Sequence, residues 1–156
     1  MGLRTRLRSR RELRNFAGSS GGGAAIEFAV ALPVLILMLI GATDFGRVYY
    51  MSLAVANAAR AGAEYGAQGN AYAVDSVGQT NFAKQDGVEA GAITVSAQRV
   101  CRCGSAVAGC TTICAGYGEP KVFVSVTASR AINLILPYPG VPNNIVVSRT
   151  ATFRVQ

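Results

Sequence analysis

The feature that most constrains this chain is an apolar run of twenty residues, from Ala24 to Thr43, which holds a single charged side chain, Glu27. A helix of about twenty residues is about 30 Å long, which is the thickness of the hydrocarbon core of a bilayer. Three glycines, residues 21–23, come directly before the run. Neither a secretory signal nor a plain membrane anchor requires such a glutamate, so the glutamate and the glycines need a common explanation.

Positive charge is concentrated ahead of this run. The chain has 156 residues and a net charge of +7. Residues 1–22 contain six arginines and one acid, whereas residues 23–156 contain nine basic and seven acidic side chains. Basic residues directly before an apolar helix keep that end in the cytoplasm, so we expect the C-terminal part to lie in the periplasm. The remainder has no basic pattern interleaved with aromatic residues, which disfavours a nucleic-acid binder.

The amino-acid composition also limits the chemistry. The chain contains no histidine and no tryptophan. Without histidine there is no His-dependent catalytic triad and no His-ligated metal site, and the sequence shows no pairing of a nucleophile with a base. We therefore expect no enzymatic activity, no cofactor, no metal and no small-molecule substrate.

The helical pattern continues beyond the apolar run. Residues 45–67 are rich in alanine and contain no proline, which favours one helix from Ala24 to Ala67, with its first half in lipid or in a filament core and its second half in solvent. Two readings of its alanines and glycines fit equally well: they are helix formers, or they allow another element to approach closely. The small residues recur at every fourth position: Ala54, Ala58, Gly62 and Gly66.

After residue 67 the pattern changes from helical to alternating. Residues 75–90 favour a second, shorter helix whose inward side is formed by Val77, Phe82 and Ala83. Three later segments alternate apolar and polar side chains, as half-buried strands do: 93–98, 122–128 and 145–155. We predict an α+β fold in which a long N-terminal helix packs on a small antiparallel sheet.

The junction before the long helix resembles the processing site of type IV pilins and pseudopilins. A prepilin peptidase cleaves these proteins after a glycine, and glutamate is the fifth residue of the product. Counting back from Glu27 makes Gly23 the first residue of the product and Gly22 the last residue of the leader. The resemblance implies that the carboxylate pairs with the new α-amine of a neighbouring subunit. Taken alone, Glu27 is more simply an acid that the helix dipole favours, but the glycines, arginines and apolar run together favour the processing site.

A longer stretch is similar to one family. Residues 23–34 (GAAIEFAVALPV), together with Gly46-Arg47 and the Ala-rich segment 57–63, resemble the TadE-like pseudopilins of the tight-adherence (Flp-type, type IVc) pilus. The resemblance implies a minor pilin that is processed by a prepilin peptidase, assembles with other pilins and pseudopilins, and meets an assembly platform in the bacterial inner membrane. Phe28 stands where the major pilins have tyrosine. Pro33 removes one backbone hydrogen bond inside the apolar helix and predicts a kink there.

Four cysteines lie close together in the later part of the chain, which favours disulfides in an oxidising compartment: Cys101, Cys103, Cys110 and Cys114. Cys101 and Cys103 would point the same way on a strand, so a bond between them would be strained. Two cross-pairings stay open, 101–110 with 103–114 and 101–114 with 103–110. A zinc site built from all four thiolates is a less favoured alternative.

These observations predict three segments: a cleaved basic leader over residues 1–22, a transmembrane or filament-core helix over residues 23–43, and a periplasmic α+β domain over residues 44–156. A single-pass periplasmic binding or adhesion module is the main alternative, and it would keep its leader and tolerate Glu27→Ala. A secreted protein that uses Arg10-Arg11 as a twin-arginine pair would lose the apolar run, but no well-placed cleavage site follows that run.

Overall fold

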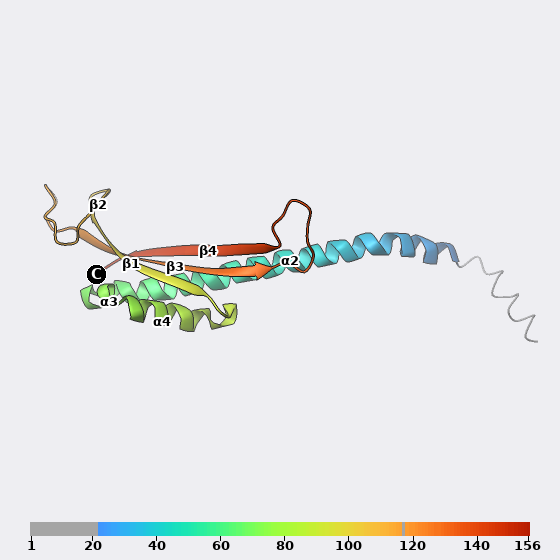
Figure 1. Ribbon diagram of the computed structural model, residues 1–156, viewed down its shortest axis with the longest axis horizontal. Helices are drawn as coiled ribbons and strands as arrows, with labels where there is room; N and C mark the ends of the chain where they lie inside the picture. Colours follow the sequence, from blue (N-terminus) through green and yellow to red (C-terminus); the bar gives the residue numbers. More distant parts are fainter. Residues whose placement is uncertain (1–21, 117) are drawn as a thin grey trace, which may run out of the picture. The chain divides into compact units, whose positions relative to one another are not determined.

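The computed structural model describes residues 22–116 and 118–156 (Figure 1). The predicted leader therefore lies outside the described residues, apart from Gly22. The chain divides into two compact units, and the division falls between Ala42 and Thr43. The elements are, in order, α2 (Gly22–Ala67), α3 (Asn70–Val74), α4 (Ser76–Asp86), η1 (Gly87–Ala90), β1 (Thr94–Cys103), β2 (Ala106–Ala108), β3 (Lys121–Asn133) and β4 (Asn144–Arg154). The predicted α+β class is confirmed.

Helix α2 is the predicted long helix, and it begins at Gly22 rather than at Ala24. Its composition of alanine, leucine and other good helix formers explains its length of 46 residues. The helical assignment continues through Pro33 without interruption, and a kink at this proline stays a prediction.

The three predicted strands are confirmed: β1 and β3 are longer than their sequence patterns, and β4 has the predicted length but begins one residue earlier. All strand pairs are antiparallel, in the order β2-β1-β3-β4. The predicted alternation holds in the central strand, where Val124, Val126 and Ala128 are fully buried. Strand β2 was not predicted, because a segment of three residues is too short to show a period.

The predicted second helix corresponds to α4 followed by the 3-10 turn η1. Ala83 is buried as expected, but the prediction was wrong for Val77 and Phe82, which are 67% and 48% exposed. Phe82 instead stacks on Tyr65 of α2, with ring centroids 4.4 Å apart. An offset aromatic pair at a helix–helix contact gains stability without full burial of either ring. The short helix α3 was not predicted.

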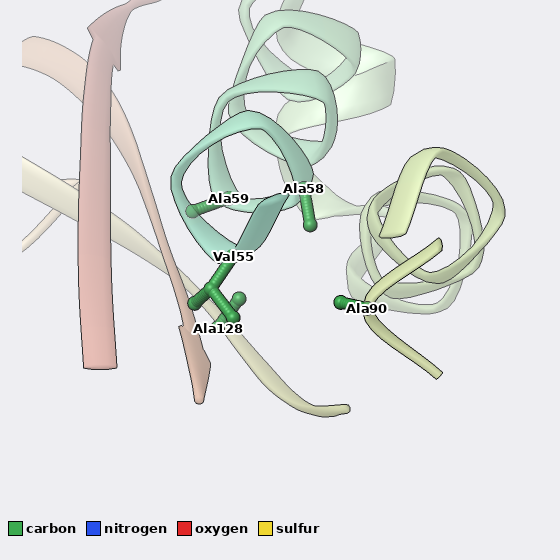
Figure 2. Close-up of a cluster of buried hydrophobic side chains, with 5 residues drawn as sticks. All are labelled: Val55, Ala58, Ala59, Ala90 and Ala128. Atoms are coloured by element: carbon green, nitrogen blue, oxygen red, sulfur yellow. The ribbon is translucent and has the colours of Figure 1, made fainter. Parts of the chain in front are cut away.

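The core lies where the second half of α2 meets the sheet and η1 (Figure 2). Val55 lies beside Ala128 of β3, while Ala58 points towards Ala90 of η1, and none of these side chains is exposed. Since alanine side chains are short, the backbones of the helix, the sheet and η1 approach one another closely. The core is therefore built on small residues rather than on large ones.

The glycines of α2 decide between the two readings of its small residues. A Cβ atom added at Gly62 would lie 2.7 Å from the carbonyl oxygen of Gln79 and 3.0 Å from the Cβ of Ala83. A Cβ added at Gly66 would lie 2.7 Å from Val124 Cγ1. Real Cβ atoms do not make such contacts, so α4 and the sheet require glycine here. Close approach is therefore the reason for these two residues, and helix propensity does not explain them.

The face of the sheet opposite to the one that packs on α2 is polar and uncharged over three rows of paired residues. Thr127 and Thr150 share a hydrogen bond of 2.8 Å, and Thr152 donates one of 3.1 Å to Ser125. We call this surface the hydroxyl face. Its rows are Thr94–Ser129–Ser148, Ser96–Thr127–Thr150 and Gln98–Ser125–Thr152.

Candidate functional site

The predicted processing site lies at the beginning of α2. Gly22 and Gly23 are the first two residues of the helix, and nothing lies within 4 Å of a Cβ built at either of them. Glu27 follows Gly23 by four residues, so both lie on the same side of the helix. Phe28 is 59% exposed. Gly22, Gly23 and Glu27 are exposed as well, so the peptide bond between the two glycines and the carboxylate are accessible, which is the minimum that the predicted cleavage and pairing require.

The first unit presents its apolar side chains outward. Between Ile26 and Leu39 the large apolar residues are 40% to 73% exposed. A run of this length on one helix cannot remain in water, so lipid or other helices must cover it. Among the described residues, α2 is the one helix that is long and apolar enough to cross a membrane. This is consistent with a single-pass membrane anchor.

Asp44 is a buried carboxylate directly after the apolar run, with 4% of its surface exposed. It accepts hydrogen bonds at 3.1 Å from the Ile135 amide with both carboxylate oxygens, and its Oδ2 accepts one at 3.2 Å from the Tyr138 hydroxyl. The guanidinium of Arg47, one turn along the helix, lies 3.6 Å from Oδ1. A buried carboxylate is tolerated only when its charge and lone pairs are satisfied in this way. Asp44 therefore fixes the segment between β3 and β4 to α2.

We call this segment, residues 134–143, the 134–143 loop. The Val141 amide donates to the carbonyl of Tyr138 at 3.1 Å, and Gly140 between them has φ of +83°. Proline at the second position and a left-handed glycine at the third are typical of a type II turn. The amide of Leu134 donates to the carbonyl of Asn143 at 3.0 Å and closes the base of the loop. The sequence thus predetermines a compact loop rather than an open one.

Burial and the neighbouring carboxylate of Asp44 raise the pKa of Tyr138, with desolvation as the larger cause. The phenol therefore stays protonated and remains a donor to Asp44. In the sequence, Asp44 marks only the end of the apolar run. No local signal could have revealed its partners, because they lie 91 and 94 residues further along the chain.

A second carboxylate organises the far end of α2. Asp75 is the N-cap of α4, since its Oδ1 accepts from the Gly78 amide at 2.8 Å, and its Oδ2 accepts from the Tyr65 hydroxyl at 3.0 Å. The Gly78 amide, and next the Tyr65 hydroxyl, lower the pKa of Asp75, because both bonds favour the ionised form. The hydrogen bond to Asp75 in turn raises the pKa of Tyr65. This contact is a structural link between α2 and α4.

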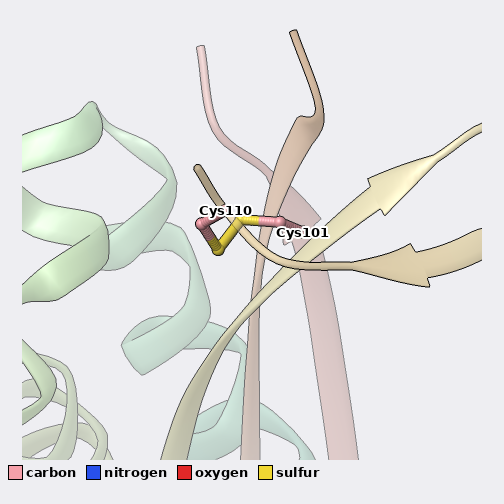
Figure 3. The surroundings of a disulfide bond; sticks show 2 residues. All are labelled: Cys101 and Cys110. Carbon is pink, nitrogen blue, oxygen red and sulfur yellow. A yellow bond between two sulfur atoms is a disulfide. The ribbon is translucent and has the colours of Figure 1, made fainter. Parts of the chain in front are cut away.

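The four cysteines form two disulfides, Cys101–Cys110 and Cys103–Cys114 (Figure 3 shows the first). Their Cα atoms are 5.0 and 5.5 Å apart, within the usual range for a disulfide. Of the two open pairings, the structure has 101–110 with 103–114. No thiol is free, so the four-thiolate zinc alternative is not the arrangement found. The two bonds fasten the β1–β2 hairpin and the loop that follows it.

Comparison with known proteins adds one match. Residues 22–64 match the family model described as TadE-like protein, and the family resemblance found in the sequence is confirmed over this segment. The matched segment contains the glycine pair, Glu27, Phe28 and Asp44, together with most of the small residues of α2. No curated protein and no solved structure matches the chain.

Proposed function

We propose that this chain, which carries the TadE-like segment, is a minor pilin or pseudopilin that acts in the assembly or structure of a tight-adherence (Flp-type) type IV pilus. The observation that supports this most strongly is where the family match falls. It begins at Gly22 and extends to residue 64, so it includes the candidate cleavage site, the lone glutamate and most of the packing face of α2. An association with a Tad pilus system follows from the family, and the role within that system is our proposal.

In the proposed pathway a prepilin peptidase hydrolyses the peptide bond between Gly22 and Gly23. The product keeps the whole apolar run and gains a positive α-amine at Gly23. A carboxylate at the centre of a bilayer costs about 2.5–3.5 kcal/mol by insertion scales and less near the interface. The amine of a neighbouring subunit would offset this cost for Glu27, which is why the charge is kept at this position.

The proposed location is the bacterial inner membrane, with the N-terminus in the cytoplasm and residues 44–156 in the periplasm, and with incorporation into the extracellular pilus. The proposed partners are the prepilin peptidase, other pilins and pseudopilins, and the assembly platform in the inner membrane. The two disulfides support an oxidising compartment for this domain. We propose no enzymatic activity, since the sequence has no histidine and shows no nucleophile paired with a base.

Mass spectrometry of the mature protein tests the proposal. We expect an N-terminus at Gly23 with the apolar run retained. Glu27→Gln should stop assembly into pili while leaving cleavage intact, because only the charge is lost. Glu64→Gln is the matched control: Glu64 lies on the same helix and pairs with Arg60 at the surface, 2.7 Å away. An intact chain that begins at Met1, or normal pili from Glu27→Gln, would support the unprocessed binding or adhesion module instead.

A further inference from the structure

The 134–143 loop contains almost only apolar residues although it lies at the surface. Residues 131–148 contain no charged side chain. Ile135 and Val141 are 52% and 45% exposed, and the three prolines of the loop are exposed as well. A charge-free, apolar loop that is held rigid is unusual on a soluble surface and indicates that something covers it.

The attachment of the loop to Asp44 shows where it lies along α2. Asp44 is the first residue after the run that ends at Thr43, and the amide of Ile135 is 3.1 Å from its carboxylate. If the run spans the hydrocarbon core, the next layer is the headgroup region, about 5–8 Å thick on each side. At 1.5 Å per residue this layer corresponds to about five residues of helix, which begin at Asp44. Asp44, and with it the Ile135 amide of the loop, would then lie at the depth of the headgroups.

These residues of α2 and the two that follow them present aromatic side chains outward. Phe45 is 74% exposed, Tyr49 is 60% exposed and Tyr50 is 51% exposed. Aromatic rings, tyrosine especially, are enriched at the membrane–water interface, because their apolar body and polar edge suit that layer. Arg47 belongs to the same turns and remains half exposed. The helix and the loop thus offer two adjoining surfaces that suit the same environment.

We propose that the 134–143 loop is a membrane-contacting element that inserts its apolar tip into the headgroup layer beside α2, while the protein is held in the membrane. The lipid that it meets is the bilayer that α2 itself spans, so no separate ligand is required. With two contacts instead of one, the periplasmic domain is held against the bilayer rather than moving freely on a single helix. The proposal rests on the membrane anchoring proposed above, and its test separates the two.

Tryptophan fluorescence provides the test, because the chain has no tryptophan of its own. The full chain is reconstituted in phosphatidylcholine vesicles whose acyl chains are brominated either near the headgroup or near the bilayer centre. One tryptophan is introduced in place of Val141 in the loop. The control is Val107→Trp in β2, another exposed valine, which is 72% exposed. Leu37→Trp inside the apolar run reports on the membrane span itself.

We expect Val141→Trp to lose about half of its fluorescence with shallow bromines and less with deep ones, as an interfacial side chain should. Leu37→Trp should be quenched most strongly by deep bromines, and Val107→Trp by neither. Quenching of Leu37→Trp without quenching of Val141→Trp would overturn the loop proposal and leave the anchor intact; a partner protein would then be what covers the loop. If Leu37→Trp is not quenched either, the proposed membrane span itself fails.

Two further variants guard against a misfolded probe. Ile135→Trp repeats the measurement at the other exposed apolar side chain of the loop, and it should show the same shallow quenching. Adding Asp44→Ala to Val141→Trp should lower the shallow quenching towards the value of Val107→Trp, because the carboxylate sets the depth of the loop. Unchanged quenching in this double variant would refute the role of Asp44 as the anchor of the loop.

Discussion

Gly62→Ala and Gly46→Ala make the same chemical change in the same helix, and the structure predicts opposite effects. Alanine is favoured over glycine inside a helix by about 0.8–1.0 kcal/mol. At Gly46 nothing lies within 4 Å of the new Cβ, so this gain should appear as higher stability. At Gly62 the new Cβ would meet the carbonyl oxygen of Gln79 at 2.7 Å, Ala83 at 3.0 Å and Val126 at 3.2 Å.

The difference between the two variants isolates the cost of packing, because the change in helix propensity is common to both. Inserting one methyl group into a filled core costs about 1–3 kcal/mol. The obstructing atom at Gly62 belongs to the backbone, which cannot change rotamer, so we expect a value in the upper half of that range. Gly62→Ala should therefore be less stable than the wild type by about 1–2 kcal/mol.

Thermal unfolding of the full chain in detergent, followed by circular dichroism of the sheet with the disulfides intact, measures this difference. About 1 kcal/mol corresponds to about 4 °C for a domain of this size, so a difference of about 2–3 kcal/mol between the two variants should appear as about 8–12 °C in Tm. Equal Tm values for Gly62→Ala and Gly46→Ala would refute the conclusion that close approach, rather than chance, places glycine on the packing face of α2.

Three other predictions follow from the contacts described above. Asp44→Ala should lower stability by about 1–3 kcal/mol and speed hydrogen exchange at the Ile135 amide, because that part-buried donor loses its acceptor; unchanged exchange would contradict the tether. Replacing Cys101 and Cys110 together by serine should cost about 2.5–3 kcal/mol in the free energy of unfolding by the loop-entropy model, measured in urea; no loss would mean that the bond is absent in solution. The pKa of Asp75 is below its ordinary value of 3.8, so its contribution to stability is complete above that value and is lost as the pH falls through the lower, folded pKa. Asp75→Asn keeps the cap but removes the titration, and its urea midpoint should therefore fall less than that of the wild type on acidification. If the urea midpoints of the two proteins fall in parallel as the pH is lowered, the lowered pKa of Asp75 does not contribute to stability.

The parts of the fold that the sequence predicts are those that depend on local periodicity. The long helix and the three strands of alternating residues belong to this group. The family resemblance also depends on a short, continuous segment, residues 22–64. Each of these signals is complete within a few tens of residues, so no knowledge of the tertiary structure is required.

The parts that sequence reasoning missed depend on which elements meet in space. Phe82 and Val77 lie at helical positions that suit a core, but α4 turns these positions away from the sheet, and Phe82 finds Tyr65 instead. Asp44 looks like an ordinary polar residue at the end of an apolar run until the loop folds back onto it. The disulfide pairing likewise depends on the hairpin that brings Cys101 opposite Ala108, close to Cys110.

The hydroxyl face has a consequence for the conditions in which the domain works. None of its nine side chains gains or loses a proton in the ordinary range of pH, and none carries a charge that dissolved ions would screen. Beyond the inner membrane, where we propose that it lies, a cell regulates neither acidity nor salinity closely. The hydration of this broad surface, and whatever contacts are made there, should therefore stay constant while the surroundings change.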